Sequence, residues 1–202
     1  MKECEYECLL NIETDGEQKG FHHSFHYHRY EPTPYIGLKQ LFDSFQLVPG
    51  DVLVDYGSGK GRLAFFVHHT YGVQTKGIEM NEDFYAAAQE NKSSYFHKFG
   101  GDEKMVQFEN CLAERYPVKK EDTVFYFFNP FSLQIFMRVI DQILQSVEEH
   151  YRDISIVLYY SSDDYQYFME NHSLFQLKKE IAITGMYERN EYERFLVYGL
   201  RY

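Results

Sequence analysis

The sequence predicts a parallel α/β sheet with helices on both faces, closed at its C-terminal end by an antiparallel hairpin. Five short apolar runs alternate with segments of helical spacing between residues 52 and 160, which is the pattern of repeated strand–helix–strand units. A glycine-rich stretch follows the first run directly and indicates a tight turn from strand to helix. The last two runs, 174–183 and 192–202, alternate like strands and are joined by a polar turn.

The composition is that of a globular protein, because 44% of the 202 residues are hydrophobic and 25% are charged. No repeat or linker divides the chain, so we expect one domain at 51–202, preceded by an extension and a capping helix at 1–50. The net charge of −11 argues against a protein that holds duplex nucleic acid by neutralising phosphates. Three cysteines, an acidic N-terminus and no long apolar run lead us to expect reduced thiols, a cytoplasmic location and no membrane span.

The first 30 residues have no clear periodicity, and a helix is predicted after them. Thr33 can cap this helix and Pro34 can be its first residue, since apolar side chains follow at helical spacing up to Phe45. Four histidines lie between His22 and His28, where alternate imidazoles would suit a metal ion on one face of a strand. No acid or cysteine completes a ligand set nearby, so packing or a lid over the substrate remains the alternative, and we expect no metal to be required.

The first strand, 52–55, ends in a loop that suits a nucleotide-type cofactor. Glycines at 57, 59 and 61 let a ligand approach the backbone, and the following helix start offers free N–H groups. A phosphate-binding P-loop is excluded because Val54 stands where its first glycine belongs and Gly61 follows Lys60. A dinucleotide fingerprint requires a small third residue, and Arg62 occupies that position.

The later elements alternate as the fold class requires. Asn81 caps the second crossover helix, and the run at 123–128 is apolar enough to be a strand buried on both faces. The predicted elements in chain order are a helix at 62–69, a strand at 74–79, a helix at 81–95, strands at 106–109 and 123–128, a helix at 132–148 and a strand at 154–160.

The glycine loop has the pattern acid-x-Gly-x-Gly-x-Gly at Asp55, Gly57, Gly59 and Gly61, and so resembles motif I of the class I S-adenosylmethionine-dependent methyltransferases. The resemblance covers residues 30–202. It implies a Rossmann-like, seven-stranded, mostly parallel sheet whose seventh strand is antiparallel beside the fifth. It also implies S-adenosyl-L-methionine as the cofactor, held by the loop with Ser58, while the Asp55 carboxylate balances the ammonium group of the cofactor.

Two further regions are expected to contact the cofactor. Glu79 ends the second strand about 20 residues beyond the glycines, where an acid can bind both ribose hydroxyls. In the family the next residue packs on the adenine, which suits Met80, although a place in the core is the alternative. The family commonly has an acid for the adenine amino group where Leu112 stands here, so Asn110, Glu114 or the Leu112 amide remain equal candidates.

The segment Asn129-Pro130-Phe131 after the fourth strand is the candidate catalytic loop. It is similar to the Asn-Pro-Pro-Tyr motif of methyltransferases that act on planar or amide nitrogens, but it lacks one proline. The resemblance implies that Asn129 accepts a hydrogen bond from the target NH₂ and that Phe131 stacks on it. The alternative is a helix start, with Asn129 as the cap and Pro130 in the first turn.

Two more segments complete the expected site. Tyr35 resembles the part of small bacterial methyltransferases that lies over the methionine end of the cofactor, and residues 159–162 after the fifth strand are candidates for lining an acceptor pocket. We therefore expect an enzyme that transfers methyl to a nitrogen or oxygen of a small molecule or a protein side chain. The rivals are a cofactor-binding or regulatory module without turnover and, more remotely, an NAD(P)-linked oxidoreductase.

Overall fold

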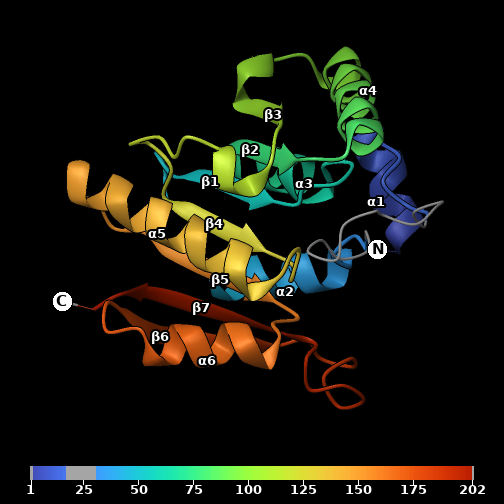
Figure 1. Ribbon diagram of the computed structural model, residues 1–202. Helices are drawn as coiled ribbons and strands as arrows, with labels where there is room; N and C mark the ends of the chain where they lie inside the picture. The colour runs from blue at the N-terminus through green and yellow to red at the C-terminus, as the bar shows by residue number, and fades with distance from the viewer. Residues whose placement is uncertain (1, 17–30, 202) are drawn as a thin grey trace.

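A computed structural model describes residues 2–16 and 31–201. Seven strands form one sheet in the order β3-β2-β1-β4-β5-β7-β6, in which β1 to β5 are parallel and β7 is antiparallel to both of its neighbours (Figure 1). This confirms the predicted Rossmann-like sheet with its terminal antiparallel hairpin. Strands β1 and β4 are neighbours and end at the same edge of the sheet. In open α/β sheets, ligand sites form at this edge.

The elements have the following bounds. The helices are α1 (Glu3–Leu10), α2 (Tyr35–Ser44), α3 (Arg62–Tyr71), α4 (Glu82–Phe99), α5 (Leu133–Glu149) and α6 (Asp163–Asn171), with short 3₁₀ turns η1 (Glu103–Met105) and η2 (Ala113–Arg115). The strands are β1 (Val52–Tyr56), β2 (Gln74–Glu79), β3 (Val106–Asn110), β4 (Val124–Phe127), β5 (Ser155–Tyr159), β6 (Phe175–Ala182) and β7 (Arg194–Leu200).

The central strands are buried on both faces, and their side chains divide between two cores. In β4, Val124 and Tyr126 pack with α2, α3 and α4, whereas Phe125 and Phe127 pack with α5 and α6 on the other face. The alternation follows from the two-residue period of a strand. Asp55 lies two positions after Leu53, which packs in the first core, so the acid is aligned with the face that α2 and α3 cover.

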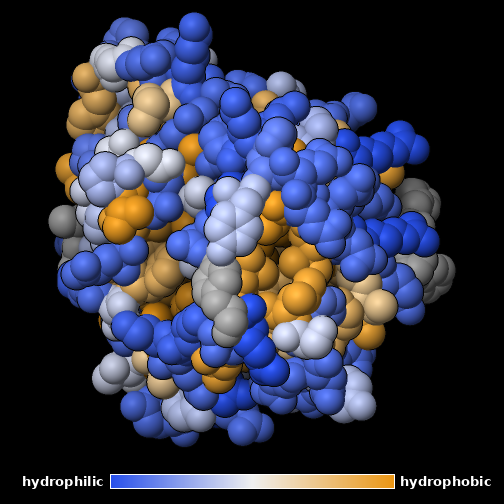
Figure 2. Space-filling model, turned by 90° about the vertical axis from the view of Figure 1, so that its left-hand side faces the viewer, coloured by the Kyte–Doolittle hydropathy of each residue, from blue (hydrophilic) through white to orange (hydrophobic). Residues whose placement is uncertain are grey.

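Figure 2 shows the side of the molecule opposite to the ends toward which the parallel strands point. Apolar side chains gather near the middle of this side and hydrophilic ones surround them. The glycine loop and the strand ends that carry the candidate site lie at the other edge of the sheet, where β1 and β4 end (Figure 1). Within the described ranges, no helix combines the length and apolarity that crossing a membrane requires.

Two helices and one cap differ from the prediction. Helix α1 buries only Glu7 and Leu10, and α6 buries only Tyr165 and Met169, so neither has the repeated apolar stripe on which a prediction depends. Thr33 does not cap α2, because the residue before this helix is Pro34 and the Thr33 hydroxyl pairs instead with the hydroxyl of Tyr126 at 2.7 Å. The histidines at 22–28 lie outside the described residues.

Candidate functional site

The loop between β1 and α3 requires its glycines. Gly57 and Gly61 have φ angles of +82° and +90°, in a region of backbone conformation that residues other than glycine rarely adopt. A Cβ atom on Gly57 would lie 2.7 Å from Pro130, and one on Gly61 would lie 2.5 Å from the ring of Phe108. The glycine spacing is therefore set by close approach as well as by the turn, and the loop touches the candidate catalytic segment.

Glu79 organises this loop from the end of β2. One carboxylate oxygen accepts a hydrogen bond from the amide of Gly59 at 2.9 Å and the other accepts from the amide of Asn81 at 2.7 Å. Burial raises the pKa of Glu79, and the backbone amides counteract that rise. The amide of Met80 also acts on this carboxylate, which still keeps acceptor capacity for a ribose hydroxyl while the loop stays tied.

The residues predicted around the adenine lie close to Glu79. The side-chain amide of Asn110 donates to the backbone carbonyl of Glu79 at 2.9 Å, which joins the ends of β2 and β3. Met80 and Leu112 are both half-buried, and Leu112 is the residue before η2. The structure thus brings these three side chains to the same sheet edge as the glycine loop.

Asp55 is a buried carboxylate in need of a cationic partner. Its side chain is 5% exposed, and among the described residues no donor forms a hydrogen bond with it. Burial raises the pKa of Asp55 to about 8, and the nearby charge of Glu79 adds to the rise. The buried hydroxyl of Ser58 also has no hydrogen-bond partner among the described residues. An ammonium group and a polar acceptor would satisfy both side chains, which fits the amino-acid end of the predicted cofactor.

A small cavity of about 30 Å³ lies beside Asp55, roughly the share of one water molecule in the liquid. It lies between the glycine loop, the segment before α2 and the end of β4. Its lining residues are Glu31, Pro32, Thr33, Asp55, Gly57, Ser58, Arg62, Leu63, Tyr126 and Phe128. We call it the donor cavity.

Tyr35 does not line the donor cavity. Its hydroxyl donates to Glu7 at 2.7 Å and its ring stacks on Tyr6 with centroids 4.5 Å apart. Burial and the Glu7 carboxylate raise the pKa of Tyr35 far above its ordinary value, so the hydroxyl stays protonated. The predicted contact between Tyr35 and the cofactor stays a prediction, because this side chain is committed to the N-terminal helix in the structure described here.

The candidate catalytic segment leaves β4 in a strained turn. Asn129 has a φ of +39°, and α5 begins only at Leu133 with Ser132 before it. The alternative in which Asn129 caps this helix is therefore wrong. Phe131 is 1% exposed and packs edge-to-face on Phe127 in the core, so its ring lies below the loop and not at its surface.

A second cavity of about 460 Å³ opens beside Asn129, and we call it the acceptor cavity. Its lining residues are Asn129, Tyr160, Ser162, Asp163, Asp164 and Tyr192. Tyr160 is held at a φ of +49°, its hydroxyl accepts a hydrogen bond from Asn190 at 2.7 Å, and its ring lies 5.6 Å from that of Tyr192. Such backbone strain is concentrated at binding and catalytic sites.

The sequence indicated part of this cavity only. Residues 159–162 were predicted to line an acceptor pocket; Tyr160 and Ser162 line this cavity, and binding of an acceptor there stays a prediction. The acids of α6 were missed because that helix was not predicted. Tyr192 was missed because it comes from the hairpin about 30 residues later, and no local pattern connects it to β5. Within the described ranges, no group of three or more metal-ligating side chains is present.

Comparisons with known proteins place the chain in a family. The family described as histone methylation protein DOT1 matches residues 11–155, which is more than half of the chain. A comparison with curated proteins finds no match.

The fold itself recurs among solved methyltransferase structures, three of which we give here. An RNA methyltransferase from Salinibacter ruber, in complex with S-adenosyl-L-homocysteine, is 21% identical with a TM-score of 0.53, over 84% of this chain and 92% of that one. A Pyrococcus horikoshii protein described as a candidate RNA methyltransferase is 14% identical with a TM-score of 0.57, over 98% of this chain and 97% of that one. Geranyl diphosphate C-methyltransferase from Streptomyces coelicolor is 12% identical with a TM-score of 0.55, over 84% of this chain and 76% of that one. The family match and the fold agree with the geometry of the glycine loop, and the chain belongs to the histone methylation protein DOT1 family, within the class I S-adenosylmethionine-dependent methyltransferases.

Proposed function

We propose that this protein transfers a methyl group from S-adenosyl-L-methionine to a nitrogen atom of a protein side chain or a small molecule. The observation that carries the proposal is that two consecutive residues at the end of β4 line the two cavities. Phe128 lines the donor cavity and the next residue, Asn129, lines the acceptor cavity. A methyl donor and its acceptor must approach in line, and cavities lined by neighbouring residues of one strand end support such an approach.

The chemistry asks little of the protein beyond position and a dry site. A sulfonium methyl is already activated: the nitrogen lone pair forms the new N–C bond, the C–S bond breaks, and its electron pair stays on sulfur. Asp55, Glu79 and the loop amides hold the donor, while Asn129 orients the acceptor at the end of β4. The exposed carboxylates of Asp163 and Asp164 can take up the proton that the nitrogen releases.

The acceptor cavity favours an amine over a phosphate-bearing acceptor. The rings of Tyr160 and Tyr192 offer π faces to a cation, and Asp163 and Asp164 add negative charge. The net charge of −11 also disfavours nucleic acid, although solved structures of the same fold include RNA methyltransferases. The description of the matched family refers to protein methylation, which supports a protein side chain as the acceptor.

Calorimetric titration tests the donor half of the proposal. S-adenosylmethionine and S-adenosylhomocysteine should bind the wild type, and NAD should not. Gly59→Val should abolish binding, because Gly59 has a φ of +52° and its amide bonds to Glu79. Tight NAD binding without binding of either sulfur ligand would contradict the assignment in favour of the oxidoreductase.

Transfer of a labelled methyl group tests the acceptor half. The wild type is incubated with labelled S-adenosylmethionine and, separately, with basic proteins, structured RNA and a panel of small amines. Label in the protein or amine samples supports the proposal, and label in RNA alone contradicts it. Binding of the cofactor with no transfer to any acceptor would favour the regulatory module.

A further inference from the structure

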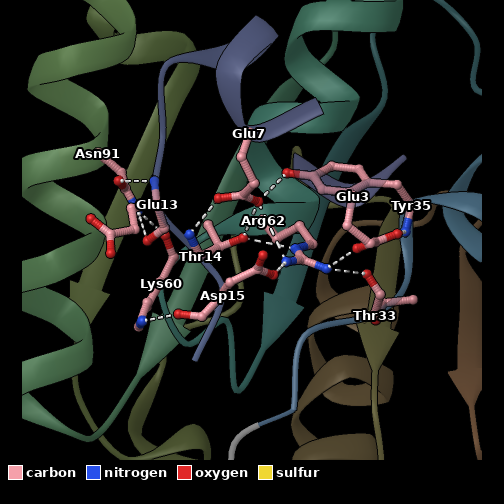
Figure 3. Close-up of polar contacts among 10 residues, drawn as sticks. All are labelled: Glu3, Glu7, Glu13, Thr14, Asp15, Thr33, Tyr35, Lys60, Arg62 and Asn91. Carbon is pink, nitrogen blue, oxygen red and sulfur yellow. Dashed lines mark hydrogen bonds and ion pairs between the residues drawn. The ribbon is translucent and has the colours of Figure 1, made fainter. Parts of the chain in front are cut away.

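The buried guanidinium of Arg62 connects the N-terminal segment to the glycine loop. Arg62 is the first residue of α3, directly after Gly61, and its side chain is 4% exposed. Arg62 occupies the position where a dinucleotide-binding loop requires a small residue. The proposed methyl transfer does not explain why this position is an arginine. Figure 3 shows it at the centre of a polar cluster between α1, α3 and the segment before α2.

All three nitrogens of this guanidinium donate to the protein. Its Nε bonds to the Thr14 hydroxyl at 2.7 Å, and Nη1 bonds to the Glu3 carboxylate at 2.6 Å. Its Nη2 bonds to Asp15 and lies 3.4 Å from Glu7. The guanidinium also lies 4.5 Å above the Tyr35 ring centre. A cation buried in this way holds its partners in one arrangement, because leaving it unpaired is costly.

Lys60, on the other side of Gly61, is anchored to the same segment. Its ammonium donates to the Asp15 carbonyl at 2.6 Å. Its own carbonyl accepts from the side-chain amide of Asn91 at 3.0 Å, and that amide group also exchanges two hydrogen bonds with the backbone of Glu13 (Figure 3). Residues 3–15, which we call the strap, therefore hold the glycine loop at both neighbours of Gly61.

We propose that the strap positions the glycine loop for the cofactor, and that Arg62 is the positioning residue that transmits this effect. The inference rests on the assignment of the cofactor site to the glycine loop. Gly61 has a left-handed φ in this loop, and the strap fixes the residue on each side of it, so the strap holds the loop amides in the arrangement that we assign to cofactor binding. Because coupling between two sites is reciprocal, cofactor binding must in turn stabilise the strap.

The test compares two variants that weaken attachment of the strap at different places. Arg62→Met removes the contact next to the loop. Lys98→Met removes a contact far from it, since the Lys98 ammonium donates to the carbonyls of Cys8 and Leu9 at 3.1 and 3.0 Å. Asp15→Ala is a milder third variant, because its side chain is 58% exposed and the fold tolerates its loss. Each variant is titrated with S-adenosylhomocysteine by calorimetry, and each melting temperature is measured.

We expect Arg62→Met to weaken binding of S-adenosylhomocysteine at least about 10-fold, which corresponds to about 1.4 kcal/mol. Asp15→Ala should weaken it by a smaller factor, and Lys98→Met should stay within about 2-fold. Hydrogen exchange supplies the reciprocal readout: in the wild type, S-adenosylhomocysteine should slow exchange of amides in residues 3–15, and in Arg62→Met this protection should be lost.

A merely structural role for Arg62 predicts a different result. The variant would then melt at a lower temperature, yet its folded fraction would bind S-adenosylhomocysteine with wild-type affinity, which overturns the proposal. Unchanged exchange of residues 3–15 on ligand binding to the wild type overturns it as well. If the wild type binds no S-adenosylhomocysteine, the assignment of the cofactor is wrong. This outcome can be told apart from failure of the strap proposal, because it is seen in the wild type alone.

Discussion

The amide of Gly59 donates a 2.9 Å hydrogen bond to the carboxylate of Glu79, so the apex of the glycine loop is tied to the end of the neighbouring strand. The acid that the sequence predicted as a ribose ligand is thus also the residue that shapes the loop. Glu79→Ala should weaken S-adenosylhomocysteine binding by about 10- to 100-fold, since a hydrogen bond to a charged group contributes about 1.5–3 kcal/mol.

Glu79→Gln separates the two roles of this side chain. The amide oxygen of a glutamine still accepts from Gly59, but the second carboxylate oxygen is replaced by a donor that can accept neither from the Asn81 amide nor from ribose. We expect an intermediate affinity in the same titration. If glutamine and alanine lose the same affinity, the loop contact contributes little and ribose binding accounts for the effect.

The pKa of Asp55 predicts an unusual pH dependence of stability. Its ordinary value is 3.8, and burial raises it to about 8 in the folded chain. Between these values the folded state binds more protons than the unfolded state, so stability falls as the pH rises through this range. Urea denaturation of the protein without cofactor should show a decline on the order of a few kcal/mol between about pH 4 and about pH 8. Asp55→Asn should remove this decline.

The same carboxyl group should release a proton when the cofactor binds. An ammonium beside Asp55 favours the charged carboxylate and lowers its pKa. At pH 7, the calorimetric enthalpy of S-adenosylmethionine binding should therefore depend on the ionisation enthalpy of the buffer, in the direction of proton release. In Asp55→Asn the dependence should disappear. A wild type that shows no buffer dependence would indicate that Asp55 is already ionised before the ligand arrives.

Gly61 combines two constraints that a matched control can separate. Gly61→Ala must accept both a φ of +90° and a Cβ atom 2.5 Å from the Phe108 ring, whereas Gly185→Ala has a φ of +84° and open space around it. We expect Gly185→Ala to cost about 1–2 kcal/mol of unfolding free energy from backbone strain alone. Gly61→Ala should cost at least about 2 kcal/mol more because the core must move. If both variants lose the same unfolding free energy, the Phe108 ring can move aside at no energetic cost.

Asn129 can act through its side chain or through its left-handed backbone, and two substitutions distinguish these. Asn129→Gly keeps the φ of +39° accessible and removes the side chain, while Asn129→Ala disfavours that φ as well. If the side chain orients the acceptor, both variants should lose about 100-fold or more in kcat. Affinity for S-adenosylhomocysteine should change little in either. Near-normal turnover of the glycine variant would assign Asn129 to the turn alone.

The sequence predicted those parts of the molecule in which local chemistry decides the structure. The strand at β1 and the glycines after it follow from residue spacing, and the parallel arrangement of β1 to β5 follows from alternation of strands and helices. The positions of Asp55 and Glu79 at strand ends could be predicted for the same reason. Local propensity is sufficient here because each feature is complete within about 25 residues.

The remaining parts depend on contacts between distant residues. The amphipathic stripe of α1 is too short to be recognised, and its place is fixed by the pairing of Glu3 and Arg62, which are separated by 59 positions. Phe131 was expected to stack on the acceptor, yet its ring is buried against Phe127, a contact that the local sequence does not indicate. Tyr192 reaches the acceptor cavity only through the folded hairpin.

The far wall of the acceptor cavity comes from the turn between β6 and β7, whereas the donor loop follows β1 in the middle of the sheet. Tyr192 belongs to that turn, and its residues make no contribution to the lining of the donor cavity. The turn bonds to α2 through Thr184 and Gln40, so changes beyond this contact should alter the acceptor cavity and leave the lining of the donor cavity in place. Exchange of the turn between homologous chains would then transfer the choice of acceptor as an inheritable module.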